Sequence, residues 1–460
     1  MTRTTNYLMR PLVLLVWAVL VASVMVVFAS QAQALTYTVA NTDDAGEGSL
    51  RSAILDANAS TGADPINFAL SPSEAHTIKL SSQLPAVTDI AGLTTIDGGS
   101  ADITISGNNA VRVFEVGKGA ELILNNLTVA DGSASATGFG GSGGGIFNAG
   151  TLDVTNSTLS GNGAADGGGG VFNASTGTLR VNNSTLSGNS ATDANSTTDA
   201  GGAIVNLGSL TVNNSTLSDN SADKGGGIFN FSGTTTLHNT IVADSPTGGN
   251  CLGGITDRGY NIDEDGSCVD EIVTTSKTTD PLLGPLADNG GPTETHALLP
   301  GSAAIDIIPQ GRGCENTTTD QRGVSRPQGD LCDIGAYEVE VEVDNTAPFV
   351  TETSPLQLKK TDNVTAKFSE PVQNVSTETF ILERKIAVKK APSRFELVDA
   401  TVSLIDGSYV LDPAQDLPKG EYRATITTEV TDMANPANAL DQDSAQAENQ
   451  PKVWTFKVAK

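Results

Sequence analysis

The sequence predicts an all-β protein in two parts, a right-handed parallel β-helix (solenoid) followed by an Ig-like β-sandwich. The first observation is a repeat: "GGGIFNAGTLDVTNSTLSGN", which starts at Gly143, returns in altered form from Gly167, Gly201 and Gly225. The second is composition, because 49 glycines with only 17% charged and 5% aromatic residues favour short strands and turns over helices. The third is a change after residue 342, where glycine thins out and longer alternating strands begin.

Asparagine occupies two positions in the copies of the repeat. The first set, which ends a GGxxxN phrase with spacings of 25, 33 and 24 residues, is Asn148, Asn173, Asn206 and Asn230. The second set, in a VxNST phrase or its nearest equivalent with spacings of 27, 31 and 25 residues, is Asn156, Asn183, Asn214 and Asn239. Stacked coils place each asparagine over its copies, so the side-chain amides can hydrogen-bond to one another. We therefore predict two structural asparagine ladders.

Short apolar runs between the asparagines predict the strands. Leu152 and Val154 alternate with polar residues, so both side chains face the same side of a strand, towards the interior of the coil. Phe147, Phe172 and Phe229 share another position of the repeat, and we expect them to stack inside the core as well. An aromatic row on the outside would instead favour glycan binding.

The residues before the repeat predict a capped start of the solenoid. Residues 48–60 carry apolar side chains at helical spacing, with Ser49 as the N-cap. A helix over the open end would cover strand edges that otherwise invite aggregation. Four short runs between residues 66 and 107, "INFAL", "HTIKL", "TTIDG" and "ITISG", predict the first and less regular coils.

The N-terminus has the pattern of a secretory signal peptide over residues 1–34. Arg3 and Arg10 precede an apolar run over residues 12–28, and a small-x-small cleavage site follows at Ala32 to Ala34. The alternative is an uncleaved anchor, since the run is close to the shortest that spans a bilayer. After signal cleavage we expect no membrane-spanning segment.

Four cysteines fit an exported protein, because an even count in a secreted chain favours disulfides. We expect local pairs, Cys251 with Cys268 and Cys314 with Cys332. A zinc site made of all four is the alternative, but no CxxC spacing supports it.

Calcium is the one cofactor that the sequence suggests. Asn261, Asp263 and Asp265 stand at alternate positions of an N-x-D-x-D-G phrase, which resembles the start of an EF-hand loop. The twelfth position is Ile272 where an EF-hand has glutamate. An acidic turn without metal is the alternative interpretation.

No catalytic residues emerge from the sequence. The carboxylates of the repeats, Asp153, Asp166, Asp219 and Asp223, do not recur at one shared position, and the three histidines are far apart. Parallel β-helices also carry polysaccharide lyases and glycoside hydrolases of the pectate-lyase-like type, so such an enzyme is the alternative function. A net charge of −27 argues against nucleic acid or an anionic membrane as a partner.

A cluster of charged residues lies near the end of the predicted solenoid. It consists of Asp320, Arg322, Arg326, Asp333 and Glu338, all within nineteen residues. We interpret it as a buried network that closes the C-terminal end of the solenoid. A ligand pocket is the alternative.

Three segments resemble known bacterial surface proteins. "TYTVANTDDAGEGSLRSAILDAN" (36–58) resembles the N-terminal cap of proteins with a CSLREA-type segment, and "GGAI" (201–204) resembles the repeats of polymorphic outer-membrane proteins. "NCLGGITDRGYNIDEDGSC", "DPLLGPLADNGGPTETHALLPGSAAID" and "TDQRGVSRPQGDLCDIGAYE" resemble the choice-of-anchor Q proteins. This resemblance implies a right-handed β-helix that is secreted and associated with a surface.

The last part of the chain resembles a bacterial Ig-like domain of the SbsA type. The phrases that carry the resemblance are "TAPFVTETSP", "NVTAKFSEPV" and "KVWTFKV", and 13 of the 26 lysines and arginines lie in this part. The alternation of Tyr422, Ala424 and Ile426 with polar residues independently predicts a half-buried strand of a sandwich.

Together these observations predict a signal peptide (1–34), a β-helix with its cap and choice-of-anchor Q-like part (35–342) and an Ig-like domain (343–460). We expect a secreted, non-catalytic bacterial protein of the cell surface or extracellular space, an adhesin or a glycan-binding protein. Its expected partners are extracellular glycans or surface proteins. Besides the enzyme, a structural stalk or matrix component is an alternative.

Overall fold

The computed structural model describes residues 35–136, 138–191, 200–268, 274–314, 318–340, 346–354, 357–358, 363–433, 438–441 and 450–458. The chain divides into two compact units, residues 1–340 and 341–460. The expected signal peptide lies outside the described residues, as do residues 192–199, which lengthen one copy of the repeat. Strands dominate both units, so the predicted all-β class is confirmed. Within the described ranges, no helix is long and apolar enough to span a membrane.

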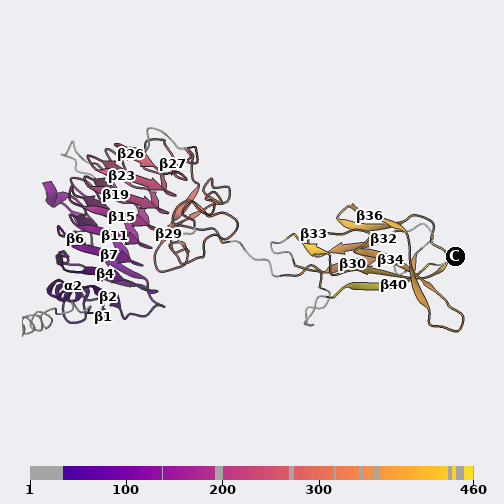
Figure 1. Ribbon diagram of the computed structural model, residues 1–460. Coiled ribbons are helices and arrows are strands. Elements are labelled where there is room, and N and C mark those ends of the chain that lie inside the picture. Colours follow the sequence, from indigo (N-terminus) through magenta and orange to yellow (C-terminus); the bar gives the residue numbers. More distant parts are fainter. Residues whose placement is uncertain are drawn as a thin grey trace, which may run out of the picture. The chain divides into compact units, whose positions relative to one another are not determined.

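The first unit is a parallel β-solenoid whose coils stack from β1 to β26 (Figure 1). Its largest sheet has nine strands, in the order β1 (Tyr37–Val39), β2 (Asp64–Phe68), β4 (Leu93–Asp97), β7 (Glu121–Asn125), β11 (Thr151–Thr155), β15 (Thr178–Asn182), β19 (Ser209–Asn213), β23 (Thr234–His238) and β26 (Ile255–Asp257). The second sheet has eight, in the order β3 (His76–Lys79), β5 (Ile103–Ser106), β8 (Thr128–Ala130), β12 (Thr158–Ser160), β16 (Thr185–Ser187), β20 (Thr216–Ser218), β24 (Ile241–Ala243) and β27 (Ile262–Asp263).

Two smaller parallel sheets run along the later coils. The six-stranded sheet consists of β6 (Phe114–Val116), β10 (Ile146–Asn148), β14 (Val171–Asn173), β18 (Ile204–Asn206), β22 (Ile228–Asn230) and β25 (Cys251–Leu252). The four-stranded sheet consists of β9 (Ser133–Ala134), β13 (Gly163–Ala164), β17 (Ser190–Ala191) and β21 (Ser221–Ala222). A short 3₁₀ helix, η1 (Gly138–Gly141), precedes β10.

The interior of the solenoid is filled by apolar side chains in register. Leu152, Leu179 and Leu210 occupy one position on β11, β15 and β19, and each is at most 1% exposed. The valines two residues further along each strand form the next inward row. Burial of one such side chain stabilises the fold by about 1.5–3 kcal/mol. A single coil cannot bury these short runs, so the stability depends on stacking.

Helix α2 (Leu50–Ala59) covers the start of the solenoid, as the sequence predicts (Figure 1). The Ser49 hydroxyl accepts a hydrogen bond from the backbone N–H of Ser52, which makes Ser49 the N-cap. Leu50, Ile54 and Ala57 face the core and are at most 1% exposed.

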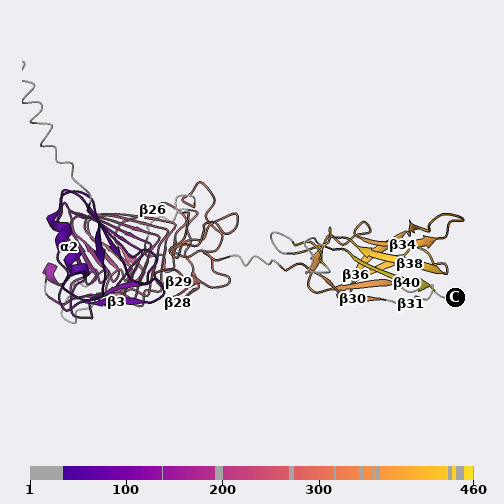
Figure 2. The ribbon, with the colours of Figure 1, turned by 90° about the horizontal axis from the view of Figure 1, so that it is seen from below.

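Residues 281–340, here called the cover segment, return along the side of the coils, apart from residues 315–317, which are not described (Figures 1 and 2). Its β28 (Leu283–Ala287) and β29 (Thr295–Leu298) form an antiparallel pair. The segment packs on the outer face of the eight-stranded sheet and reaches β12, in the middle of the stack. The expectation that it closes the C-terminal end is therefore wrong, because its polar groups pair with the side of the solenoid.

The second unit is a sandwich with its own core. One sheet has the order β30 (Val350–Ser354), β32 (Val364–Phe368), β37 (Ser408–Pro413) and β36 (Ala400–Ile405). The other has the order β31 (Gln357–Leu358), β40 (Lys452–Val458), β38 (Gly420–Ile426), β34 (Phe380–Ile386) and β35 (Arg394–Leu397), and β33 (Val372–Gln373) pairs with β39 (Thr431–Asp432). Tyr422, Ala424 and Ile426 are fully buried, as their alternation predicts.

Candidate functional site

The first asparagine set forms a continuous ladder inside the solenoid. Asn148 Nδ2 donates to Asn173 Oδ1 at 2.8 Å, and Asn173 Nδ2 donates to Asn206 Oδ1 at 2.8 Å. Asn206 Nδ2 donates to Asn230 Oδ1 at 3.0 Å. All four residues are buried, and a buried amide without partners costs about 1–3 kcal/mol. The ladder therefore fixes the register of the coils.

The second set combines a ladder with a sharp corner. Asn156, Asn183, Asn214 and Asn239 have φ angles between 46° and 53°, the left-handed region that asparagine tolerates better than most residues. Asn183 Nδ2 donates to Asn156 Oδ1 at 2.7 Å, and Asn239 Nδ2 donates to Asn214 Oδ1 at 2.9 Å. Asparagine thus turns the chain and links the coils at one position.

The structure contains a third asparagine ladder, which we did not predict from the sequence. Asn162 Nδ2 donates to Asn189 Oδ1 at 2.9 Å, and Asn189 Nδ2 donates to Asn220 Oδ1 at 3.0 Å, with all three residues buried. The signal is present in the sequence, because these residues end the phrases "STLSGN", "STLSGN" and "STLSDN".

The phenylalanines of the repeat face the outer side of the six-stranded sheet, so the prediction that they lie inside the core is wrong, although Phe147 and Phe172 do stack and Phe172 is buried. On β10, Ile146 and Asn148 are fully buried and point into the coil. Phe147 lies between them and points to the opposite side, since successive strand residues alternate. Phe172 and Phe229 stand in the same register on β14 and β22 and also lie outside the core cluster of the solenoid.

These residues belong to an apolar row on the six-stranded sheet, here called the outer column. It consists of one residue from each of five coils: Phe147, Phe172, Val205, Phe229 and Leu252. The rings of Phe147 and Phe172 stack with centroids 5.4 Å apart, and the Arg112 guanidinium lies 5.2 Å from the Phe147 centroid. Phe229 meets Phe231 edge to face at 5.7 Å, and Phe231 is 67% exposed.

A cavity of about 260 Å³ lies over Val205. Its lining is mainly apolar: Asp166, Phe172, Ala200, Val205, Leu207, Lys224, Phe229 and Phe231. Oδ2 of Asp166 is buried and has no hydrogen-bond partner within the described part of the chain. A mainly apolar cavity with a few polar groups at its edge is typical of a small-ligand site.

The outer face of the eight-stranded sheet is covered; it is polar on β12, β16 and β20 and apolar on β24 and β27, where Ile241 and Ile262 pack with the cover segment. Thr158, Thr185 and Thr216 share one outward position. Thr185 Oγ1 donates to Oε1 of Gln321 at 2.7 Å, and Gln321 Nε2 donates to Thr158 Oγ1 at 2.9 Å. Thr216 Oγ1 accepts from the backbone N–H of Ala336 at 3.1 Å. The cover segment thus supplies partners for hydroxyls that would otherwise face water.

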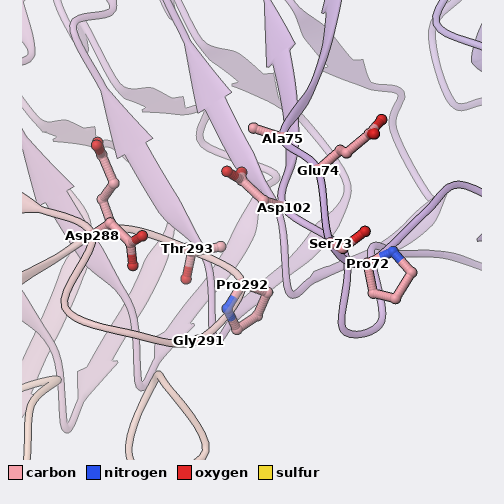
Figure 3. Close-up of a pocket in the computed structure, with 10 residues that line it drawn as sticks. Pro72, Ser73, Glu74, Ala75, Asp102, Asp288, Gly291, Pro292 and Thr293 are labelled. Carbon is pink, nitrogen blue, oxygen red and sulfur yellow. The ribbon is translucent and has the colours of Figure 1, made fainter.

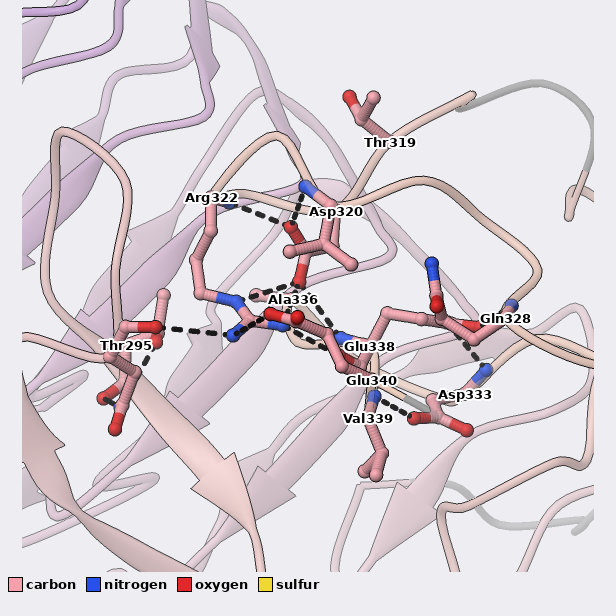
Figure 4. A network of polar contacts seen from close by, with 12 residues as sticks. Thr295, Thr319, Asp320, Arg322, Gln328, Asp333, Ala336, Glu338, Val339 and Glu340 are labelled. Atoms are coloured by element: carbon pink, nitrogen blue, oxygen red, sulfur yellow. Dashed lines mark hydrogen bonds and ion pairs between the residues drawn. The ribbon is translucent and has the colours of Figure 1, made fainter. Parts of the chain in front are cut away.

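The charged cluster lies within the cover segment and is buried (Figure 4). Arg322 forms an ion pair with Asp320 at 2.8 Å and stacks over the Tyr337 ring at 3.6 Å. Arg326 donates to the carbonyl oxygens of Asp333 and Gly335 at 2.9 and 2.8 Å. Both arginines are at most 3% exposed in their side chains.

The carboxylates of this cluster accept hydrogen bonds from backbone groups of the cover segment (Figure 4). Glu338 accepts from the backbone N–H groups of Gln328 and Asp333 at 3.1 and 2.9 Å, and it lies 3.7 Å from Arg326. Asp333 accepts from the N–H groups of Asp306 and Val339 at 2.7 and 2.6 Å. Burial raises the pKa of Glu338 to about 7, although Arg326 opposes the shift. These contacts support the structural interpretation over a ligand pocket.

An acidic hollow of about 290 Å³ lies where residues 72–75 face the 288–294 loop of the cover segment (Figure 3). Glu74, Asp102, Asp288 and Glu294 line it. Burial and the nearby Asp288 raise the pKa of Asp102. Among the described residues, no group of three or more histidines, cysteines or carboxylates could hold a metal ion.

The suggested calcium ligands are held in hydrogen bonds of their own loop. Asn261 Oδ1 accepts from the Thr240 N–H at 2.9 Å, and Asp263 Oδ2 accepts from the Cys268 N–H at 2.7 Å. Both Asp265 oxygens also accept from neighbouring groups. Burial raises the pKa of Asp263 to about 6. The geometry is that of a hydrogen-bonded acidic turn.

The cysteines form the local pairs expected from the sequence, Cys251 with Cys268 and Cys314 with Cys332. The first pair joins β25 to the turn that follows β27. The second lies inside the cover segment and packs in its core cluster. Each links residues fewer than twenty positions apart, so it fixes a local loop.

The titratable residues considered for catalysis lie on different parts of the solenoid. Asp153 pairs with Arg180 at 2.9 Å on the nine-stranded sheet, whereas Asp166 lines the cavity beside the six-stranded sheet. His238 stands in register with Asn213 at the end of β23. His296 lies in the cover segment, where Nε2 is 2.9 Å from Ser187 Oγ. The structure therefore does not bring Asp153 and Asp166 together.

Comparisons with known proteins address the second unit. Residues 344–458 match a family model described as a bacterial Ig-like domain. Among solved structures, the chain is similar to PcoC, a methionine-rich copper resistance protein from Escherichia coli, with 18% identity over 25% of this chain and 100% of that chain and a TM-score of 0.17. The comparison with curated proteins gives no match. An Ig-like domain together with a β-helix fits a surface or extracellular protein of bacteria.

Proposed function

We propose that this chain is a secreted, non-catalytic adhesive protein of the bacterial surface or extracellular space, and that its β-helix binds glycans through the outer column. The observation that carries the proposal is the row of apolar side chains that faces outward at one position in five successive coils. Aromatic side chains in such a row offer apolar contact area to the faces of sugar rings.

The accessible end of the column supports binding. Phe231 is 67% exposed and lines the cavity over Val205, and Leu252, in register with Phe229, is 43% exposed. Exposed apolar side chains that gather in one place on a soluble protein mark an interaction site more often than scattered ones do. A purely structural stalk has no need of them, which makes the stalk the weaker candidate.

A polysaccharide lyase or hydrolase is the second candidate. The fold permits it, but Asp153 and His238 lie on separate strands of the nine-stranded sheet and Asp166 lies beside the six-stranded sheet. In an enzyme, the outer column would bind the polysaccharide substrate. The adhesive protein and the enzyme would therefore both bind polysaccharide, but only the enzyme would cleave it.

One experiment tests both. The mature chain is incubated with neutral and acidic polysaccharides, with and without Ca²⁺, and the same tubes are read for retention and for new reducing ends or unsaturated products. Retention without cleavage is the expected result. Cleavage of any polysaccharide would replace the proposal by the enzyme, and no retention at all would favour the stalk. Phe231→Ala is expected to weaken retention, whereas Leu404→Ala, which changes an exposed leucine of the other unit, serves as the matched control.

A further inference from the structure

The outer column is interrupted at one coil. Phe147, Phe172 and Phe229 carry rings, but Val205, between the last two in register, carries a short side chain. The cavity of about 260 Å³ lies at this interruption and is lined by Phe172 on one side and by Phe229 and Phe231 on the other. The missing ring of the stack therefore leaves a slot one coil wide.

The size of the slot follows from the spacing of the coils. Neighbouring strands lie about 4.8 Å apart, so Phe172 and Phe229, two coils apart, are separated by roughly 9.6 Å. Two van der Waals contacts of about 3.5–4.0 Å each add up to about 7–8 Å. A single six-membered ring fits between the two walls, with Val205 as the floor.

The edge of the slot is polar. Asp166 and Lys224 supply the charged groups of the lining. A carboxylate at the edge of a cavity accepts hydrogen bonds from ligand hydroxyls. A sugar ring offers an apolar face of C–H groups together with hydroxyl donors at its edge, whereas a phenyl ring offers no donor.

We propose that the slot binds one pyranose ring of a neutral glycan, with an apolar face of the sugar against Phe172 or Phe229 and a hydroxyl donating to Asp166. This inference rests on the proposed function and names its ligand class. The net charge of −27 disfavours an acidic glycan. The flanking Phe231 extends the apolar contact to the next sugar of the chain.

The sharpest test fills the slot without removing any group. In Val205→Phe the column gains its missing ring, and we expect the affinity for neutral oligosaccharides to fall at least tenfold while the melting temperature stays the same or rises. Thr211→Phe, which adds the same ring on the outer side of the nine-stranded sheet, is the matched control and keeps wild-type affinity. Asp166→Leu is expected to weaken binding severalfold. Titration calorimetry with cello-, xylo- and galacturono-oligosaccharides measures all of them.

The outcomes separate this inference from the proposed function. Wild-type affinity in Val205→Phe would overturn the slot but leave glycan binding by another part of the column in place. Equal loss in Val205→Phe and Thr211→Phe would also overturn it, as would a preference for galacturono-oligosaccharides. If the wild-type chain binds none of the oligosaccharides but binds aromatic peptides that Val205→Phe excludes, the ligand class is wrong. If nothing binds, the proposed function fails with it.

Discussion

Two outer faces of the same solenoid differ in an unexpected way. The eight-stranded sheet presents threonines, Thr158, Thr185 and Thr216, which water could satisfy, and yet the chain covers them. The six-stranded sheet presents the outer column, in which Phe172 and Val205 are buried, whereas Leu252 within it and Phe231 beside it stay exposed. Exposed apolar side chains are the ones that a protein would ordinarily cover first.

The two faces differ in the partners that the chain gives them. The cover segment brings its own amide, imidazole and backbone groups to the threonine face, so that contact is specific and belongs to the fold. The outer column has no such partner in the described cover segment, and its cavity opens at a point where the repeat departs from phenylalanine. We infer that the first face is structural and the second is functional.

The largest expected effect on this contrast comes from the charged cluster of the cover segment. Arg326→Met removes the cation but leaves Glu338 buried, so we expect a loss of about 3–5 kcal/mol in the free energy of unfolding of the segment. Limited proteolysis within residues 281–340 and chemical denaturation measure it. Arg394→Met, in an exposed ion pair, is the control and should change stability by less than about 1 kcal/mol. Equal protease resistance in wild type and Arg326→Met would contradict a structural role for the first face.

The second effect is a pH dependence of the same contact. Glu338 has a pKa of about 7 in the fold and 4.5 when unperturbed. The protonated carboxyl therefore stabilises the folded state fully below pH 4.5, and this stabilisation is lost as the pH rises through 7. The loss amounts to up to about 3 kcal/mol. Melting temperatures at pH 5 and pH 8 should therefore differ less in Glu338→Gln than in wild type. Glu340→Gln, in a largely exposed side chain of the same segment, should keep the wild-type slope.

The third prediction concerns the threonine face itself. Thr185→Val keeps the shape but leaves Oε1 of Gln321 without its hydroxyl donor, which costs about 1–3 kcal/mol. Thermal unfolding of the first unit measures the change. Thr211→Val, on a half-buried outward position of the nine-stranded sheet, is the matched control. A smaller loss in Thr185→Val than in Thr211→Val would mean that the cover segment does not depend on these hydrogen bonds.

The smallest effect on stability is expected on the open face. Phe231 is 67% exposed, so Phe231→Ala should change the free energy of unfolding by less than about 0.5 kcal/mol. Retention on neutral polysaccharide should nevertheless fall. A large loss of stability would show that this ring is part of the fold, and the distinction between the two faces would disappear.

Repetition made much of the fold predictable from the sequence. Asparagines at constant positions indicated buried ladders, because only stacked coils give repeated amides a common partner. Local patterns in the sequence predicted the helix N-cap at Ser49 and the buried strand around Tyr422. Tertiary contacts did not override either pattern. The cysteine pairs followed from short separations in the chain.

The outer column was misjudged for a definite reason. In "IFN", apolar isoleucine and phenylalanine are neighbours, and only one of them can face the core. Placing the asparagine of each ladder inside forces Ile146 inward and Phe147 outward, so the two predictions made from the sequence were incompatible. The path of the cover segment had no local signal at all, because its partners, such as Thr158 and Gln321, are 163 residues apart.

The positive φ angles of the second asparagine set have an evolutionary consequence. One corner of each coil depends on an asparagine and on its contacts with the identical position of neighbouring coils, and the number of residues from one such asparagine to the next varies from 25 to 31. A gene segment that encodes one coil can therefore be duplicated, deleted or lengthened without redesign of the rest. The height of the solenoid, and with it the number of positions along the outer column, is open to change by recombination alone.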